Sequence, residues 1–393
     1  PEFDFINSPF YVARELESWE CDSTPRRAGV SSFGIGGTNV HAILEEAPEI
    51  TRPEAPPLSC YLLPLSAKTS AALEQAKDRL ETHLLTNPDS NIADVAYTLQ
   101  IGRNSFPARY FFIAKGKKDI VESFTNCGRN NRGRNNGSIT NNTGSAVIDF
   151  AFPDQIGTHY QMDYSFYLTQ TIYSQCIDRC CSYLARSYGL DIKNMLFNPE
   201  KDAVLSNMQD ISIDRVKTFI LQYAMALLLM DCGVESRLVT GTGTGRYAAL
   251  SIAHIIEPED ALRLIMDSSN HQASGRKSDF TKDIAIKPAQ INYLSSTGIL
   301  TKTGQEINLA LEIENPEIKD ILNIVKEKWE GLQHICLVVG RPEKEEDFGI
   351  TNDKGTGTEC QIIDLFPGCE KEWDLEILLS TLGELWLSGI NIK

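Results

Sequence analysis

A glycine-rich turn at residues 239–246 is the strongest local candidate for chemistry in this chain. The turn lies between an expected strand and an expected helix and reads Val239-Thr240-Gly241-Thr242-Gly243-Thr244-Gly245-Arg246. A nucleophile elbow in this setting places a serine at the middle of G-x-S-x-G, where a tight turn presents its hydroxyl at a helix N-terminus. The middle position here is Gly243, which has no side chain and can attack nothing.

Three other uses of the turn remain open. A glycine-rich turn from strand to helix can hold a phosphate. The dinucleotide fingerprint, however, needs a glycine where Arg246 stands, and a Walker loop needs Lys followed by Ser or Thr. Thr242 or Thr244 could replace the nucleophile, although both are β-branched and neither occupies the presented position. The turn could also be purely structural.

The cysteines do not indicate a metal site. Ten cysteines are scattered over 393 residues without a C-x-x-C pair. The nearest approach to a cluster is Cys176, Cys180 and Cys181, which fall on one helical stretch and are expected to be buried, small apolar residues. We therefore expect no metal and no cofactor, and the cytosol is the default compartment.

Composition narrows the function classes. With 42% hydrophobic and 23% charged residues the chain is typical of a globular protein. Its net charge of −16 disfavours nucleic acid as the main partner. No apolar run approaches the roughly 20 residues that cross a bilayer, and the longest, Phe219–Met230, contains Gln222 and predicts a buried helix. The chain begins at Pro1 without Met, so we expect a piece of a longer protein.

The elements that must position the turn alternate between strand and helix, which predicts an α/β fold with a parallel sheet covered on both faces. The expected strands are Val40–Leu44, Tyr61–Leu65, Ala108–Ala114, Ala146–Phe152, Val234–Thr240, Ile291–Leu294 and Ile335–Val339. The expected helices are one capped by Ser66 and running to Leu85, Ile92–Leu99, Tyr164–Tyr188, one capped by Asp214 and ending near Gly233, Arg246–His254, one opened by Pro258, Asn315–Trp329 and Trp373–Leu387.

A polar segment interrupts this pattern at residues 125–145. It consists mostly of Asn, Gly, Arg and Thr and cannot bury enough surface to offset its ordering entropy, which predicts a flexible surface loop. With the lysines just upstream it forms the clearest basic region of the chain: Lys115, Lys117, Lys118, Arg129, Arg132 and Arg134. A solvated loop is the simple interpretation, and a docking patch for an acidic partner is the other.

The N-terminal segment resembles the C-terminal end of a ketosynthase from a type I modular polyketide synthase. The long and specific match runs from Pro25 to Pro48 and contains the loop Phe33-Gly34-Ile35-Gly36-Gly37-Thr38-Asn39. In that family the loop lies beside the active-site cysteine, and the position of Phe33 gates the acyl pocket. The resemblance implies that Phe33, Gly34, Gly36 and Gly37 are a remnant of this gating loop.

The resemblance continues in the order of the family over nearly the whole chain, through shorter matches. Residues 62–67, 92–99 and 102–103 resemble the linker domain between ketosynthase and acyltransferase. Phe152-Pro153-Asp154-Gln155-Ile156-Gly157 stands where an acyltransferase has its F-P-G-Q-G-A opening. The implied divisions are a ketosynthase tail at 1–48, the linker domain at 49–124, the loop at 125–145, an acyltransferase-like domain at 146–345 and a following linker at 346–393.

The departures from the family bear on every part of its catalytic machinery. The serine position is Gly243, the arginine that would hold a malonyl carboxylate falls at Ser268, and Asp154 with Gln155 forms a degenerate oxyanion loop. The small inserted subdomain and the histidine it carries are missing, because a polar stretch, 267–282, leads almost directly to the next strand.

None of the six histidines is an obvious substitute base. His271 is the only candidate by position, and we expect it in a solvated loop. The others fall in the ketosynthase-like tail, in a linker helix or at structural positions: His41, His83, His159, His254 and His334.

The resemblance with these losses implies an α/β, hydrolase-like parallel sheet with flanking helices, lacking the small subdomain, beside a small α+β linker domain. It implies a non-catalytic scaffold or docking domain of a cytoplasmic polyketide synthase. The expected partners are the remainder of the ketosynthase and, through docking, a carrier protein and a separate acyltransferase. Two alternatives stay open: acyl transfer through a rearranged nucleophile, and coenzyme or nucleotide binding at Gly241–Gly245.

Overall fold

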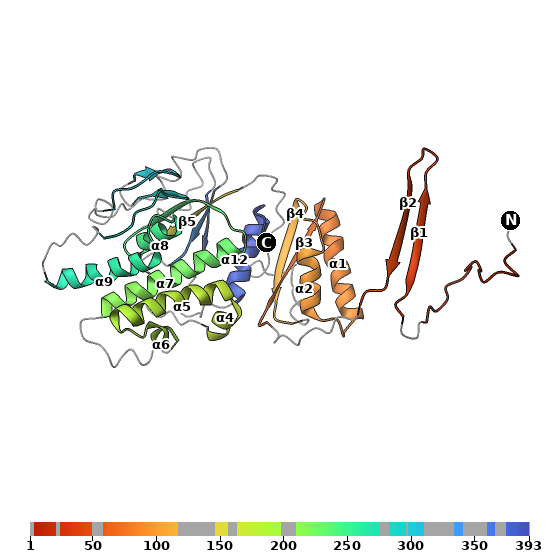
Figure 1. The fold of residues 1–393 in the computed structure, drawn as a ribbon, viewed down its shortest axis with the longest axis horizontal. Coiled ribbons are helices and arrows are strands. Elements are labelled where there is room, and N and C mark those ends of the chain that lie inside the picture. The colour runs from red at the N-terminus through yellow and green to blue at the C-terminus, as the bar shows by residue number, and fades with distance from the viewer. Residues whose placement is uncertain are drawn as a thin grey trace. The chain divides into compact units, whose positions relative to one another are not determined.

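Figure 1 shows the computed structural model of the chain. It describes residues 4–20, 24–48, 58–116, 146–155, 163–197, 210–274, 283–295, 298–309, 334–340, 360–365 and 375–392. The chain divides into two compact units, Pro1–Pro57 and Leu58–Lys393, and each is described by itself. The expected loop at 125–145 and the expected helix at 315–329 lie outside the described residues.

The first unit contains a β-hairpin. Strand β1 (Arg27–Phe33) pairs antiparallel with β2 (Asn39–Glu45) along their whole lengths. The glycine-rich loop makes the connection, with Gly37 at a φ of +92°. The sequence pattern predicts only the second strand. The structure adds β1, whose glycine and two serines give it a weak strand propensity.

The second unit begins with a small α+β element. Strands β3 (Tyr61–Ala67) and β4 (Ala108–Ala114) pair antiparallel, and helices α1 (Ser70–Thr86) and α2 (Ile92–Ile101) connect them. Leucines and aromatic residues of both strands form a core with the two helices. This is the α+β unit that the sequence predicts for this region.

The predicted helix cap at Ser66 is wrong. Ser66 lies within β3, where its hydroxyl accepts from the N–H of Phe106 at 3.1 Å and donates to the carbonyl of Asn104 at 3.2 Å. The cap of α1 is Thr69, whose side chain accepts from the N–H of Ala72. Because Thr69 is followed by good helix formers, it takes the role that the sequence pattern assigns to a serine three residues earlier.

A six-stranded sheet forms the centre of the second unit, in the order β10-β9-β5-β6-β7-β8. All neighbouring strands are parallel except β7 and β8. The strands are β5 (Val147–Phe152), β6 (Ser236–Gly241), β7 (Asn292–Leu294), β8 (Leu300–Thr301), β9 (His334–Val338) and β10 (Cys360–Asp364). The predicted α/β class is therefore confirmed.

Helices pack on this sheet, with α5, α7 and α9 side by side (Figure 1). The helices are α4 (Tyr164–Thr169), α5 (Thr171–Tyr188), α6 (Ile192–Phe197), α7 (Asp210–Asp231), α8 (Gly245–Ile252), α9 (Pro258–Ser274) and α12 (Leu375–Leu387). The side chains of Ile148, Phe150 and Phe152 belong to the same buried cluster as these helices.

Two predicted helix limits are wrong. Asp214 is no cap, because α7 already begins at Asp210. The single helix predicted for 164–188 is interrupted at Gln170, whose extended ψ of 94° ends α4 before α5 begins. The predicted opening of α9 at Pro258 is confirmed.

The last helix, α12, packs on β3 and β4 and so joins the α+β element to the rest of the second unit. Phe111 and Ile113 of β4 face the large core, whereas Tyr110 and Phe112 face α1 and α2. The Arg109 guanidinium lies 5.1 Å from the ring centroid of Trp386 and donates to the Trp386 carbonyl. The alternation of β4 between two cores explains why nearly all of its residues are apolar.

Candidate functional site

The glycine-rich turn has the geometry of an elbow between strand and helix. β6 ends at Gly241, α8 begins at Gly245, and Gly243 between them has a φ of +49°. The Thr242 N–H donates to the Phe152 carbonyl at 2.9 Å, which fastens the turn to the end of β5. A Cβ on Gly245 would lie 2.6 Å from the Pro153 carbonyl oxygen, so only glycine fits there.

Asp154 fills the space in front of the elbow. Because β5 and β6 are parallel and pair with Phe152 opposite Gly241, the residues that follow each strand meet at one edge of the sheet. A Cβ on Gly243 would lie 2.6 Å from the Cβ of Asp154, and closer still to its carboxyl carbon and Oδ1. The Thr244 N–H donates to Asp154 Oδ1 at 2.5 Å. The carboxylate therefore fills the position at which an elbow presents its nucleophile. It also accepts the hydrogen bond of the next amide, the Thr244 N–H.

The loop that carries Asp154 rests on a buried glutamine, a role that the sequence alone does not predict. Gln222 of α7 is fully buried, and its Nε2 donates to the Pro153 carbonyl at 2.7 Å. The backbone of Gly340, at a φ of +144°, also lies close to the side-chain amide of Gln222. A Cβ at position 340 would lie 2.9 Å from Gln222 Nε2. A lone glutamine in an apolar helical run is the signal that could have found this contact. Gln155, the other residue of the predicted oxyanion loop, is exposed.

Ser268 comes close to the elbow through Tyr247. Its Oγ donates to the Ile265 carbonyl of its own helix at 2.9 Å. The pKa of Tyr247 on α8 is raised, mainly by burial. Asp154 also raises this pKa, whereas Arg246 and a hydrogen bond with Ser268 act in the opposite direction. Gly243 and Asp154 are thus brought together at the elbow, whereas Ser268 interacts with Tyr247 on the helix that follows it. The hydroxyl of Ser268 lacks the charged, bidentate fork with which an arginine binds a carboxylate.

The remaining side chains of the turn have local roles. The Arg246 Nε donates to the Gly243 carbonyl at 2.8 Å. Thr244 occupies the cap position of α8 with a buried side chain that makes no capping hydrogen bond.

The described histidines are spread over the chain. His271 lies within α9, so the polar stretch predicted from residue 267 begins as helix and not as loop. His334 is buried on β9, with its Nδ1 3.3 Å from Asp149 Oδ2 on β5. His254 ends the turn after α8 at a φ of +59°, and His41 lies 2.8 Å from the Ser31 hydroxyl on the hairpin. His159 lies outside the described residues.

The predicted docking residues are only partly described. Lys115 makes an ion pair with Glu376 of α12 at 2.8 Å, so it helps to hold that helix. The other five lie outside the described residues: Lys117, Lys118, Arg129, Arg132 and Arg134.

The cysteines of α5 are buried thiols. A hydrogen bond with Cys176 and burial raise the pKa of Cys180, and burial raises that of Cys181 to about 12. Such thiols stay protonated and make poor metal ligands. Among the residues that the structure describes, no group of three His, Cys, Asp or Glu side chains could hold a metal ion.

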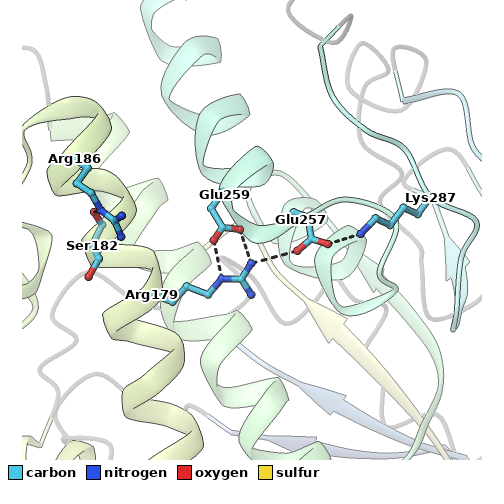
Figure 2. A network of polar contacts seen from close by, with 6 residues as sticks. All are labelled: Arg179, Ser182, Arg186, Glu257, Glu259 and Lys287. Carbon is cyan, nitrogen blue, oxygen red and sulfur yellow. Dashed lines mark hydrogen bonds and ion pairs between the residues drawn. The ribbon is translucent and has the colours of Figure 1, made fainter.

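An ion-pair network crosses from α5 to the chain that follows α9 (Figure 2). Arg179 binds Glu259 through two bonds of 2.7 and 2.8 Å and reaches Glu257 at 3.3 Å. Lys287 binds the other side of Glu257 at 2.5 Å and, above all other causes, lowers its pKa. The network fastens the short connection that leads from α9 back to β7. A polar groove of about 580 Å³ lies beside it, with Ser182 and Arg186 in its wall.

Comparison with known proteins agrees with this architecture. The family described as "CurL-like, PKS C-terminal" matches residues 61–124. A phenolphthiocerol/phthiocerol polyketide synthase subunit of Mycobacterium tuberculosis is 30% identical over 277 residues, covering 67% of this chain and 18% of that protein. Spectinabilin polyketide synthase system protein NorA of Streptomyces orinoci is 28% identical over 274 residues, covering 67% of this chain and 14% of that protein. The chain thus spans less than a fifth of the length of these relatives.

Solved structures identify the fold of the second unit. The acyl transferase domain of ZmaA has a TM-score of 0.70 at 18% identity, covering 85% of this chain and 95% of that domain. The acyltransferase domain from module 8 of the salinomycin polyketide synthase has a TM-score of 0.65 at 15% identity, with 85% and 97% covered. The fold is that of an acyltransferase domain.

The class of protein is therefore an α/β fold like that of an acyltransferase domain, preceded by the small α+β element. The sequence matches and the fold together support a segment of a modular polyketide synthase that carries such a domain. None of the helices described in the structure is long and apolar enough to cross a membrane.

Proposed function

We propose that this acyltransferase-like domain transfers no acyl group and serves as a scaffold or docking domain of its polyketide synthase. The carrying observation is the elbow itself: its presented residue is Gly243, and the space for a nucleophile holds the carboxylate of Asp154. Loss of a single member of a catalytic triad already costs orders of magnitude in rate. A site that has no nucleophile, and whose nucleophile position is filled by another side chain, has no ordinary route to an acyl-enzyme.

The rest of the domain supports a role that needs the fold and not the chemistry. The buried strands of the sheet, the helices that pack on them and the turn from β6 to α8 are all present. Residues 275–291 alone join α9 to β7, and a stretch below about 40 residues seldom forms a stable domain. The chain therefore has no small subdomain at this point to carry a catalytic histidine.

The scaffold needs partners, and the proposal names three. The hairpin of the first unit, with the loop Phe33–Gly37, is assigned to the remainder of a ketosynthase. A separate acyltransferase would load the carrier protein, with the basic residues between Lys117 and Arg134 as the docking candidates. We place the multienzyme in the cytoplasm, where buried thiols such as Cys180 and Cys181 stay reduced.

Intact-protein mass spectrometry after incubation with malonyl-coenzyme A tests the proposal. An active acyltransferase domain serves as the positive control and should gain one malonyl group. We expect no adduct on the native chain. A stoichiometric adduct would instead establish the enzyme alternative, and mapping it would show whether Thr242 or Thr244 carries the acyl group.

Thermal unfolding with coenzyme A or a nucleotide tests the remaining alternative. A ligand that binds at Gly241–Gly245 would raise the Tm with its concentration. Because Asp154 already holds the Thr244 N–H, we expect no rise.

A further inference from the structure

We propose that Asp154 is a built-in occupant of the oxyanion position and forms a coupled pair with Gly243. The inference rests on the proposed function and deepens it, because the site is closed by an added carboxylate as well as by a missing serine. The start of α8 is thus a site for a small carboxylate. The chain fills this site itself with the side chain of Asp154.

Steric overlap gives the first argument. Any Cβ at position 243 falls within 2.6 Å of the Asp154 Cβ, well inside van der Waals contact. Rotating the carboxylate away therefore does not relieve the clash, since the Cβ is fixed by the backbone of its loop. Glycine at 243 is thus the residue that Asp154 requires, quite apart from the positive φ of the elbow.

The electrostatics of the helix start give the second argument. The Thr244 N–H is the amide that follows the nucleophile position, which in an elbow donates to the oxyanion. In this chain it donates to Asp154 Oδ1, a charge-assisted bond at the positive end of α8. A negative charge fixed there satisfies the amide and repels a second one, so an oxyanion has neither a donor nor a favourable field.

The loop behind Asp154 holds the carboxylate in place. The Pro153 carbonyl accepts from Gln222 of the buried α7, and the Phe152 carbonyl accepts from Thr242 of the elbow. The residues on both sides of the overlap are therefore anchored to the core. The Cβ of Asp154 therefore cannot move away from position 243 without breaking these bonds.

A double-mutant cycle in urea tests the coupling. The four proteins are the native chain, Gly243→Ala, Asp154→Gly and the double variant. We expect Gly243→Ala to lower the unfolding midpoint strongly in the native background and much less beside Asp154→Gly. Equal losses in the two backgrounds would overturn the proposal.

The matched control is Gly189→Ala. Gly189 ends α5 at a φ of +68° with open space around its Cβ position, so it measures the cost of positive φ without a clash. We expect its loss to be the same in both backgrounds. The loss at Gly243 should fall to a similar size once Asp154 is removed.

Chemical rescue tests the carboxylate site directly. Asp154→Gly leaves the Thr244 N–H without its acceptor, and sodium formate or acetate should fill the gap. We expect a rise in Tm of about 2 °C or more for this variant relative to sodium chloride at equal ionic strength, and none for the native chain. Equal responses of variant and native chain would overturn the proposal.

These outcomes are separable from those of the proposed function. A native chain that is labelled by malonyl-coenzyme A sinks the non-catalytic role, whatever the cycle shows. Additive losses in the cycle sink the coupled pair even if the native chain stays unlabelled.

Discussion

Cys181 lies on α5 with its thiol turned into the core, and burial raises its pKa from 9.0 to about 12. Cys232, near the end of α7, shows the same effect with a pKa of about 11. A raised thiol pKa means that the folded chain keeps a proton that the unfolded chain loses. The stability this provides is present below about pH 9 and is lost as the pH rises toward the folded pKa.

We predict that the free energy of unfolding falls by about 1.4 kcal/mol per pH unit for each such thiol above pH 9. Urea unfolding under reducing conditions at pH 8, 9 and 10 measures this. Cys181→Ala and Cys232→Ala should each make the dependence between pH 9 and pH 10 shallower by this amount, because both folded pKa values lie above pH 10. Three parallel stability curves would contradict the prediction.

The candidate site is partly visible at the residue scale. Residue type alone shows that Gly243 carries no nucleophile, and the resemblance to the acyltransferase family implies that Asp154 stands in place of a glycine. The sequence does not show that the two side-chain positions coincide, because that depends on β5 and β6 ending at the same sheet edge in one register. Gln222 and Tyr247 escape prediction for the same reason: each acts through a contact between distant segments.

At the scale of elements, apolar periodicity predicts most strands and helices to within a few residues. The errors come from local competition between caps, as at Ser66 and Thr69, or from a helix that starts early, as at Asp210. Strand β1 escapes prediction because its pairing with β2, and not its own propensity, makes it a strand. Pairing partners are not encoded in a single segment.

The packing of α12 on β4 gives a prediction at this scale. A Cβ on Gly383 would lie 2.5 Å from Phe111 Cδ2 and 2.6 Å from Cζ, and would therefore overlap with this ring. The ring is almost fully buried and has little space to move. We expect Gly383→Ala to destabilise the second unit by about 2 kcal/mol, because overpacking outweighs the gain in helix propensity. Urea unfolding measures the loss, and Phe111→Leu in the same chain should reduce it. A stabilised Gly383→Ala variant would show that α12 is not fixed on β4.

At the scale of the whole molecule, the two units differ in how they bury apolar surface. The second unit has a large core that includes fully buried side chains such as Phe150 and Leu250. In the hairpin of the first unit no side chain is buried. Val30, Val40 and Leu44 lie on one face of the hairpin, and each is more than half exposed. A two-stranded hairpin is marginally stable in water by itself. The first unit therefore depends on something that covers this face.

Hydrogen exchange measures that dependence. We predict that amides of β1 and β2 exchange orders of magnitude faster than those of β5 and β6 in the isolated chain. A ketosynthase lacking its own last strands, added in trans, should slow exchange in the hairpin and leave the central sheet unchanged. Leu44→Asp is the matched variant, since a charge on this face should abolish the slowing without changing the urea unfolding of the second unit. Full protection of the hairpin without a partner would mean that its ion pairs, Arg27 with Glu45 and Arg26 with Glu46, stabilise it alone. The ketosynthase would then not be needed to order it.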